Sequence, residues 1–320
     1  MPPYTEGAHE VADGVLAYTQ PNGGWGLSNG GLVAGAERSL LIETLSDLAH
    51  TRRMLDALGE AGRAAPGIET VVNTHSNPDH CWGNQLVAGS AEIIASRAAA
   101  QEMLQLQPEV LRTVKASVPP DTPEGRFFEL LFGSYDFSDV VVTPPTRTFE
   151  GALTLDLGGV EVQLREVGPA HTKGDVIVHI PSAGVVFTGD IVFAGAHPIM
   201  WDGPVANWIA ACDTLLELGA RTVVPGHGPI GDDTSVRDMR EYLVYVEREA
   251  RGRFDAGMDV LDAAYDIHLE AFAGWLDQER IVVTVNSLYR EFGSDQVVDA
   301  EPELLSAMAR YRFAHDQHAH

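Results

Sequence analysis

The sequence predicts an α/β fold, in which short buried strands alternate with helices. Short apolar runs bounded by turn residues recur along roughly the first 235 residues, and segments with helical spacing lie between several of them. In addition, polar residues of the kind that bind metals directly follow four of the expected strands. The chain contains no tandem repeat and no low-complexity linker, which favours folded structure throughout.

In the first half, residues Ser39–Thr44 read as a buried strand. A helix follows, with an apolar face formed by Leu45, Leu48, Leu55 and Leu58. Ile68–Asn73 and Ala91–Ser96 are the next expected strands. A segment from about residue 97 to 148 changes to helical and aromatic-rich sequence and is expected to be an insertion between two halves of a sheet-based domain.

The second half resumes with strands, because apolar and polar residues alternate around Val162 and again around Val178. Further strands are expected within residues 184–190 and 220–228. Three helical segments follow, at residues 241–254, 260–276 and 279–292. These patterns predict a catalytic domain over residues 1–234 and a helical extension over residues 235–320, whose apolar residues would cover the domain or form a homodimer contact.

The charge balance restricts the partners of the protein. Its 46 acidic and 21 basic residues give a formal charge of −25, which repels polyphosphates and anionic membrane surfaces. We therefore expect neither a nucleic-acid nor a membrane partner. No stretch resembles a leader peptide or a membrane span, and the only cysteines, Cys81 and Cys212, are too few for a disulfide scaffold. A cytoplasmic location and free thiols are the corresponding expectations.

Ligand-type residues occur in four separate places just beyond apolar strands. The first place is the run THSNPDHCWGN, with His75, Asn77, Asp79 and His80; the others contain His171, Asp190 and His227. Imidazole nitrogens and carboxylate oxygens are the usual ligands of catalytic zinc. Loops at strand ends commonly bring such residues together, so the four places predict one metal site.

In order, local context and separation, these motifs resemble those of the metallo-β-lactamase superfamily, over roughly residues 10 to 232. The resemblance implies a four-layer αββα sandwich with a two-metal site at one edge. It implies His75 and His171 as ligands of the first metal, Asp79, His80 and His227 as ligands of the second, and Asp190 as a bridge. Zinc is the expected cofactor, as one or two ions, and iron is the alternative.

Asn77 departs from the family motif, which usually has a third histidine for the first metal at this place. An amide oxygen is a poor substitute for imidazole on zinc, so either the first metal is weakened or Asn77 hydrogen-bonds a substrate oxygen. Three interpretations remain: a two-metal site with one altered ligand, a mononuclear enzyme, or a decayed pseudoenzyme. As the other predicted catalytic residue, Asp79 would orient the attacking hydroxide or carry its proton.

Several neighbouring residues have alternative roles. Glu43, where relatives usually carry an aspartate, is expected either to support the metal loop or to be an ordinary capping carboxylate. Cys81 is expected to be a buried thiol, and His197 is a candidate for substrate contact. A set of aromatic residues would line a broad pocket, or else belong to the core or a dimer interface: Phe127, Phe128, Phe132, Tyr135, Phe137, Trp201 and Trp208.

The resemblance implies a zinc-dependent hydrolase acting on a carbonyl substrate. The negative charge disfavours the nuclease branch of the superfamily. A narrower resemblance, to the cyclase/thioesterases of aromatic polyketide (antibiotic) biosynthesis in actinobacteria, implies a small-molecule or acyl-carrier-bound thioester that is cleaved, cyclised by aldol closure, or both. The alternatives are a generic thioesterase, a lactonase, a glyoxalase II-like hydrolase, a mononuclear iron dioxygenase of the persulfide dioxygenase type, or a non-catalytic binding module.

Overall fold

Two β-sheets form the centre of the molecule in the computed structural model, which describes residues 2–62 and 65–316. The first sheet has the order β1-β2-β3-β4-β5-β6-β7, antiparallel from β1 to β4 and parallel from β4 to β7. Its strands are β1 (Gly7–Ala12), β2 (Val15–Thr19), β3 (Gly30–Ala34), β4 (Ser39–Ile42), β5 (Ile68–Val72), β6 (Glu92–Ser96) and β7 (Arg147–Phe149). The second sheet has the order β12-β11-β10-β9-β8, and only the β11–β12 pair is parallel. Its strands are β8 (Ala152–Asp156), β9 (Glu161–Glu166), β10 (Val176–Ile180), β11 (Val185–Phe187) and β12 (Thr222–Val224).

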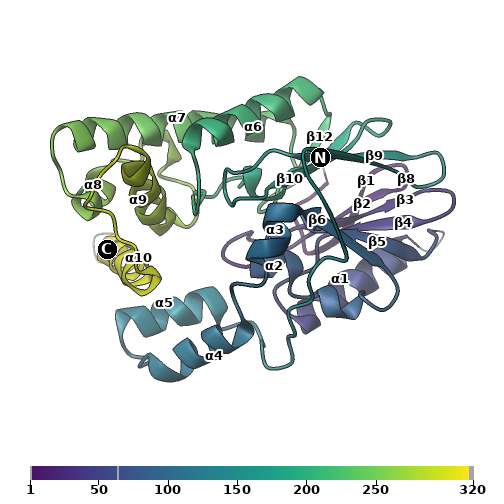
Figure 1. The fold of residues 1–320 in the computed structure, drawn as a ribbon, viewed down its shortest axis with the longest axis horizontal. Helices are drawn as coiled ribbons and strands as arrows, with labels where there is room; N and C mark the ends of the chain where they lie inside the picture. Colours follow the sequence, from purple (N-terminus) through teal and green to yellow (C-terminus); the bar gives the residue numbers. More distant parts are fainter. Residues whose placement is uncertain (1, 63–64, 317–320) are drawn as a thin grey trace.

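The two sheets pack face to face with helices on both outer surfaces (Figure 1). Buried residues of both sheets, such as Val33 and Val178, form one apolar cluster between them. Helix α1 (Leu48–Ala61) packs Met54 and Leu58 against the outer face of the first sheet, and Asp47 caps its first turn. Helices α6 (Val205–Leu218) and α7 (Asp233–Asp255) cover the second sheet. This arrangement confirms the predicted αββα sandwich.

The segment from residue 97 to 148 contains three helices and then returns to the first sheet as β7. The helices are α3 (Arg97–Glu102), α4 (Pro108–Ser117) and α5 (Pro123–Phe132). The last of them packs against the C-terminal helix α10 (Glu301–Asp316), as Figure 1 shows. The predicted insertion is therefore helical, and it links the sandwich to the end of the chain.

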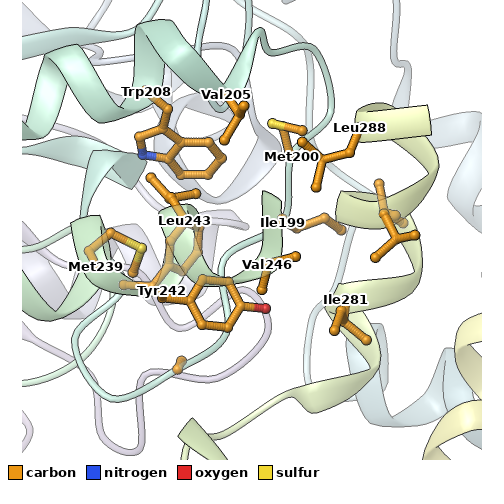
Figure 2. Close-up of a cluster of buried hydrophobic side chains, with 14 of the residues drawn as sticks. Ile199, Met200, Val205, Trp208, Met239, Tyr242, Leu243, Val246, Ile281 and Leu288 are labelled. Atoms are coloured by element: carbon orange, nitrogen blue, oxygen red, sulfur yellow. The ribbon is translucent and has the colours of Figure 1, made fainter. Parts of the chain in front are cut away.

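The C-terminal helices share a hydrophobic core with α6 and α7. Helices α8 (Val260–Asp266) and α9 (Ile281–Glu291) contribute to a cluster in which Trp208, Leu243 and Leu288 come from three different helices (Figure 2). Helix α7 begins at Asp233 and runs through the predicted boundary at residue 234. Among the described residues, no helix is long and apolar enough to cross a membrane.

The prediction of one helix over residues 260–276 is wrong in its second part. Helix α8 ends at Asp266, and a short 3-10 helix at Glu270–Phe272 follows. The helix ends because Ile267 has an extended backbone, with ψ 117°, and Glu270 has a positive φ of 49°. At the end of the segment, Leu276 donates its N–H to Gly195, and the N–H of His197 donates back to Leu276, which is a strand-like pairing.

Candidate metal centre

The four predicted motifs meet at one edge of the sandwich. The first lies in the loop after β5 and in the short helix α2 (Pro78–Cys81), and His171 lies in the β9–β10 loop. Asp190 follows β11, and His227 follows β12. All of the predicted ligands are therefore held by rigid strand ends, which suits a site that needs fixed geometry.

The carboxylate of Asp190 lies at the centre of the cluster. Its Oδ2 atom is 3.7 Å from His75 Nε2, 3.5 Å from His171 Nε2 and 3.4 Å from His227 Nε2. Its other oxygen, Oδ1, is 3.2 Å from His80 Nε2. One carboxylate thus faces all four imidazoles, as the predicted bridging role requires.

The cluster has the donor set and the orphaned polar atoms expected of a metal site. Groups of three side chains place a ligand atom each within 4.8 Å of one another, in the sets His75–His171–Asp190 and Asp79–His80–His227. Within the described part of the chain, the buried atoms His75 Nε2, His80 Nε2 and Asp190 Oδ1 have no hydrogen-bond partner. Buried polar atoms without partners are costly, and a divalent cation would satisfy them. The residues therefore fit one or two metal ions.

The charges in the cluster stabilise one another. Burial lowers the pKa of His75 and of His171, so both imidazoles are neutral and offer a nitrogen lone pair. Burial opposes ionisation of Asp190, but its histidine neighbours outweigh this effect and hold the pKa of the carboxyl well below its usual range. Burial likewise opposes charging of His227, yet Asp190 and Asp79 raise its pKa to about 9.

We call His75, Asn77 and His171 the first subsite, and Asn77 makes a direct contact there. His171 donates from Nδ1 to the Ile199 carbonyl at 2.7 Å, so its Nε2 carries the lone pair. The amide Nδ2 of Asn77 donates to that lone pair at 3.0 Å. His75 is held through Nδ1 by the hydroxyl of Thr74 at 3.0 Å. Asn77 therefore occupies the nitrogen that His171 would otherwise offer to a metal.

The second subsite consists of Asp79, His80 and His227. The Oδ2 atom of Asp79 lies 3.2 Å from His227 Nε2 and 3.6 Å from His80 Nε2. Glu43 stands behind His80, with Oε1 3.3 Å from its Nδ1. Whereas both histidines are buried, the Asp79 side chain remains 14% exposed. The second subsite thus has one ligand that a substrate can reach.

Glu43 and two glycines support the loops that carry these ligands. The carboxylate of Glu43 accepts hydrogen bonds from the backbone N–H and the hydroxyl of Thr74. Gly226 packs so closely on Asp190 that a Cβ atom there would lie 1.9 Å from Oδ1. Gly189 has φ +51°, and a Cβ atom there would lie 2.4 Å from the Thr74 hydroxyl. Larger residues at either glycine would displace the centre.

The substrate contact expected for His197 is wrong, and most of the aromatic set follows the core alternative. His197 is fully buried away from the cluster: its Nε2 donates to the Phe272 carbonyl, and its Nδ1 accepts from Tyr242. Most of the aromatic residues expected in a pocket are core residues less than 9% exposed: Phe127, Phe128, Tyr135, Phe137 and Trp208. Trp208 packs its ring against His171 and donates to the Ile191 carbonyl, so it supports a predicted ligand and lines no pocket. Phe132 and Trp201 are partly buried beside the same cores.

The two cysteines are free and buried, as expected. Cys81 contacts the carbonyl oxygens of Ser76 and Asn77, and burial raises the pKa of its thiol well above the usual value. Sequence reasoning missed Thr74, which joins Glu43 to His75, and Phe193, whose ring stacks on that of His227 at 5.2 Å. Thr74 directly precedes His75, and Phe193 follows Asp190 by three residues. This closeness in sequence to a predicted ligand was the only available signal.

Comparison with known proteins agrees with this geometry. The family model of the metallo-β-lactamase superfamily matches residues 23–227, which is more than half of the chain. The chain belongs to the metallo-β-lactamase superfamily. The match begins at the loop before β3 and ends on His227, so it includes every predicted ligand of this metallo-β-lactamase-fold protein.

Its curated relatives include thioester hydrolases. An acyl-coenzyme A thioesterase from Gallus gallus is 25% identical over 205 residues, which are 61% of this chain and 70% of that protein. A hydroxyacylglutathione hydrolase from Hyphomonas neptunium is 25% identical over 178 residues, 52% of this chain and 51% of that protein. The chain thus spans about half the length of the second relative.

Solved structures share the fold. A metallo-β-lactamase from Pontibacter korlensis covers 74% of this chain and 98% of its own, at 20% identity and a TM-score of 0.55. A sec-alkylsulfatase from Pseudomonas sp. covers 93% of this chain and 51% of its own, at 16% identity and a TM-score of 0.67. The second match is long enough to extend into the helices that follow Asp233.

Proposed function

We propose that this protein is a metal-dependent hydrolase that cleaves an acyl thioester. The observation that carries the proposal is the buried cluster of four imidazoles around the Asp190 carboxylate, with the partly exposed Asp79 beside it. Two relatives at 25% identity are named for thioester hydrolysis, one acting on acyl-coenzyme A and one on hydroxyacylglutathione. These relatives favour a thioester over the other carbonyl substrates of the superfamily.

Asp79, His80, His227 and Asp190 would hold one zinc ion, and His75, His171 and Asp190 would hold a second. When bound, zinc supplies a Lewis acid and acidifies water. The chain itself keeps the imidazoles oriented through Thr74, Ile199 and Glu43. It also buries the cluster, so that bulk water reaches it only on the side of Asp79 and Asn77.

Asp79 is the residue placed to orient a water molecule. Burial raises the pKa of its carboxyl, but His80 and His227 outweigh this and hold the pKa below its usual range. It is therefore ionised and would accept a hydrogen bond from the water at Oδ2, and its low pKa favours this orienting role over carrying the proton. Asn77 lies beside it, half-buried, and its amide would hydrogen-bond a substrate oxygen when it is not bonded to His171.

A second candidate function is a mononuclear iron dioxygenase. His75, His171 and Asp190 form one of the clusters within 4.8 Å, and two histidines with one carboxylate are the ligands that such enzymes use. The Asn77–His171 hydrogen bond counts against this alternative, because it engages one of the three ligands.

The narrower hypothesis of an aromatic polyketide thioester concerns the substrate of the same site. It predicts that the partner is a small-molecule or acyl-carrier-bound thioester.

A homodimer is a separate part of the proposal. Tyr265 and Leu276 are large apolar residues of the extension that stay more than a third exposed, and a contact between two copies of the chain would form there.

The test is a substrate panel with controlled metal content. Protein purified without added metal is analysed for zinc and iron, then assayed with acyl-coenzyme A, hydroxyacylglutathione and poly-β-ketoacyl thioesters while oxygen is monitored. We expect zinc, thioester cleavage, loss of cleavage after chelation and recovery on adding zinc. Iron with oxygen consumption would replace the proposal by the dioxygenase, and a zinc-loaded protein inactive on every thioester would overturn it.

A further inference from the structure

His227 differs from the other three histidines of the centre in how its ring is held. His75, His80 and His171 each have an oxygen atom within 3.3 Å of Nδ1, from Thr74, Glu43 and Ile199 respectively. His80 Nδ1 and His227 Nδ1 are both buried without a hydrogen bond in the described ranges, but His80 Nδ1 faces the Glu43 carboxylate, whereas the ion pairs of His227 run through Nε2. Because a metal-binding imidazole is normally oriented through its second nitrogen, another contact must fix this ring.

Phe193 makes that contact. Its ring stacks on His227 with 5.2 Å between the ring centroids and only 7° between their planes. The two residues also form a parallel backbone bridge, and Ala194 donates its N–H to the His227 carbonyl. The Phe193 ring therefore determines which way the His227 ring can face.

Arg280, at the start of α9 in the C-terminal extension, in turn contacts Phe193. Its guanidinium carbon lies 5.1 Å from the Phe193 ring centroid and 4.3 Å from that of Trp25. Both distances fit cation–π contacts, which are strongest where water is excluded. The residue is only 1% exposed, so it does not reach a substrate and acts through the rings beside it.

The guanidinium is itself fixed in place. It donates through Nη1 to the His197 carbonyl at 3.1 Å and pairs through Nη2 with Asp277 at 3.0 Å. Trp25 is tied to the same segment, because its indole N–H donates to Glu279 at 2.8 Å. The hydroxyl of Tyr135, in the insertion, donates a hydrogen bond to the Trp25 carbonyl. Parts of the chain more than 250 residues apart therefore meet beside His227.

We propose that Arg280 is a positioning residue for the metal centre, and that it orients His227 by holding the Phe193 ring against it. The inference rests on the proposed metal-binding role of His227. If Arg280 has this role, the C-terminal extension completes the second subsite. Without the extension, the sandwich over residues 1–234 would no longer hold the His227 ring in one orientation.

The test compares Arg280→Met and Arg280→Lys with Arg290→Met as a matched control. Arg290 lies in α9, the helix that Arg280 precedes, is about half exposed and pairs with Asp299, so the control removes a guanidinium that makes no contact with the Trp25 or Phe193 ring. Zinc binding is measured by competition with a chromophoric chelator, and the side-chain ¹⁵N shifts of His227 are recorded in zinc-free protein. Circular dichroism and thermal melting identify any variant that does not fold.

We expect Arg280→Met to weaken the second subsite about tenfold or more, the usual effect of losing a support behind a metal ligand. Arg280→Lys keeps the charge beside Asp277 but loses the flat guanidinium, so it should fold and weaken the same subsite less. The first subsite should change less in both, because Phe193 meets His171 only edge-on at 5.6 Å and His171 is also held by the Ile199 carbonyl, and the His227 ¹⁵N shifts should change. Folded Arg280 variants with wild-type zinc affinity and His227 shifts would overturn the inference, as would equal weakening in Arg290→Met. A wild-type protein that binds no zinc would instead overturn the metal centre itself.

Discussion

The two subsites of the centre share Asp190 but differ in what their remaining ligands contact. In the second subsite, Asp79 and His80 face inward with Glu43 behind His80. In the first, the amide of Asn77 donates to the nitrogen of His171 that a metal would use. A metal at the first subsite must therefore displace the amide of Asn77, whereas a metal at the second displaces only the protons of His80 and His227 and contacts between residues that are themselves predicted ligands. One changed residue, Asn77, can thus make two adjacent metal sites differ in affinity while the positions of the other ligands are preserved.

Replacing Asp190 should have the largest effect, because its carboxylate faces both subsites. We expect Asp190→Ala to abolish turnover and to remove tight zinc binding, since all four imidazoles lose their shared acceptor. Turnover and zinc content are measured together, with circular dichroism to show that the fold persists. Asp233→Ala, an exposed carboxylate paired with Arg237, serves as the control. Activity retained in Asp190→Ala would refute the metal assignment.

Replacing Asn77 changes the first subsite alone. Asn77→His removes the amide that occupies His171 and supplies an imidazole, so zinc content should rise from about one to about two equivalents per chain. Asn77→Ala distinguishes the loss of the competing amide from the gain of an imidazole ligand, because it removes the amide and adds no ligand. An unchanged zinc content in Asn77→His would show that Asn77 faces the substrate and leaves the ligands free.

Replacing Glu43 tests the support of the second subsite. Glu43→Gln removes the charge 3.3 Å from His80 Nδ1, and supports of this kind are worth about 10- to 100-fold in metal affinity. Chelator competition should show the larger loss at the tighter zinc equivalent and a smaller one at the weaker, because Glu43 also holds Thr74, which contacts His75. Glu69→Gln, on an exposed position of β5, is the matched control. An unchanged affinity at the tighter equivalent would contradict the assignment of Glu43 to the second subsite.

At His197, which is buried and is not a predicted metal ligand, the effect of acid on folding can be measured apart from acid release of metal. Burial lowers the pKa of His197 from 6.5 to about 4. The unfolded chain therefore binds a proton below pH 6.5 that the folded protein takes up only near pH 4. The stability present above pH 6.5 should fall by ~3 kcal/mol as the pH drops through this window.

Urea unfolding of zinc-free protein at pH 7 and pH 4.5 measures this fall. His197→Gln keeps a donor toward Phe272 and an acceptor for Tyr242, so it should fold and show a smaller pH dependence. An identical pH dependence in the variant and the wild type would show that other groups cause the loss.

Much of the fold followed from local patterns. The runs around Leu41, Val71 and Ile94 are buried on both faces and gave clear strand signals, and Val162 and Val178 alternated with polar residues. Strands β1 to β3, β7 and β8 were not predicted. Two glycines begin β3, and β8 is an edge strand with an exposed face, so neither shows a strong apolar pattern.

The candidate site could be predicted only in part. The order of the motifs indicated which residues would meet, and the structure places six predicted ligands together. Neither the Asn77–His171 hydrogen bond nor the contact between Arg280 and Phe193 has a local signal, because each joins side chains far apart in sequence. The expectation of a substrate contact for His197 shows the reverse error, and Trp208 follows the core alternative rather than the pocket alternative. Both are close to Asp190 in sequence, but their side chains turn into the C-terminal core.

The central claim is that the second subsite holds the tighter metal, and a zinc titration tests it most directly. Wild type, His75→Ala and His227→Ala are titrated against a chromophoric chelator under the same conditions. We predict two steps for the wild type, loss of the weaker step in His75→Ala and loss of the tighter step in His227→Ala. Loss of the tighter step in His75→Ala, with that step retained in His227→Ala, would contradict the account.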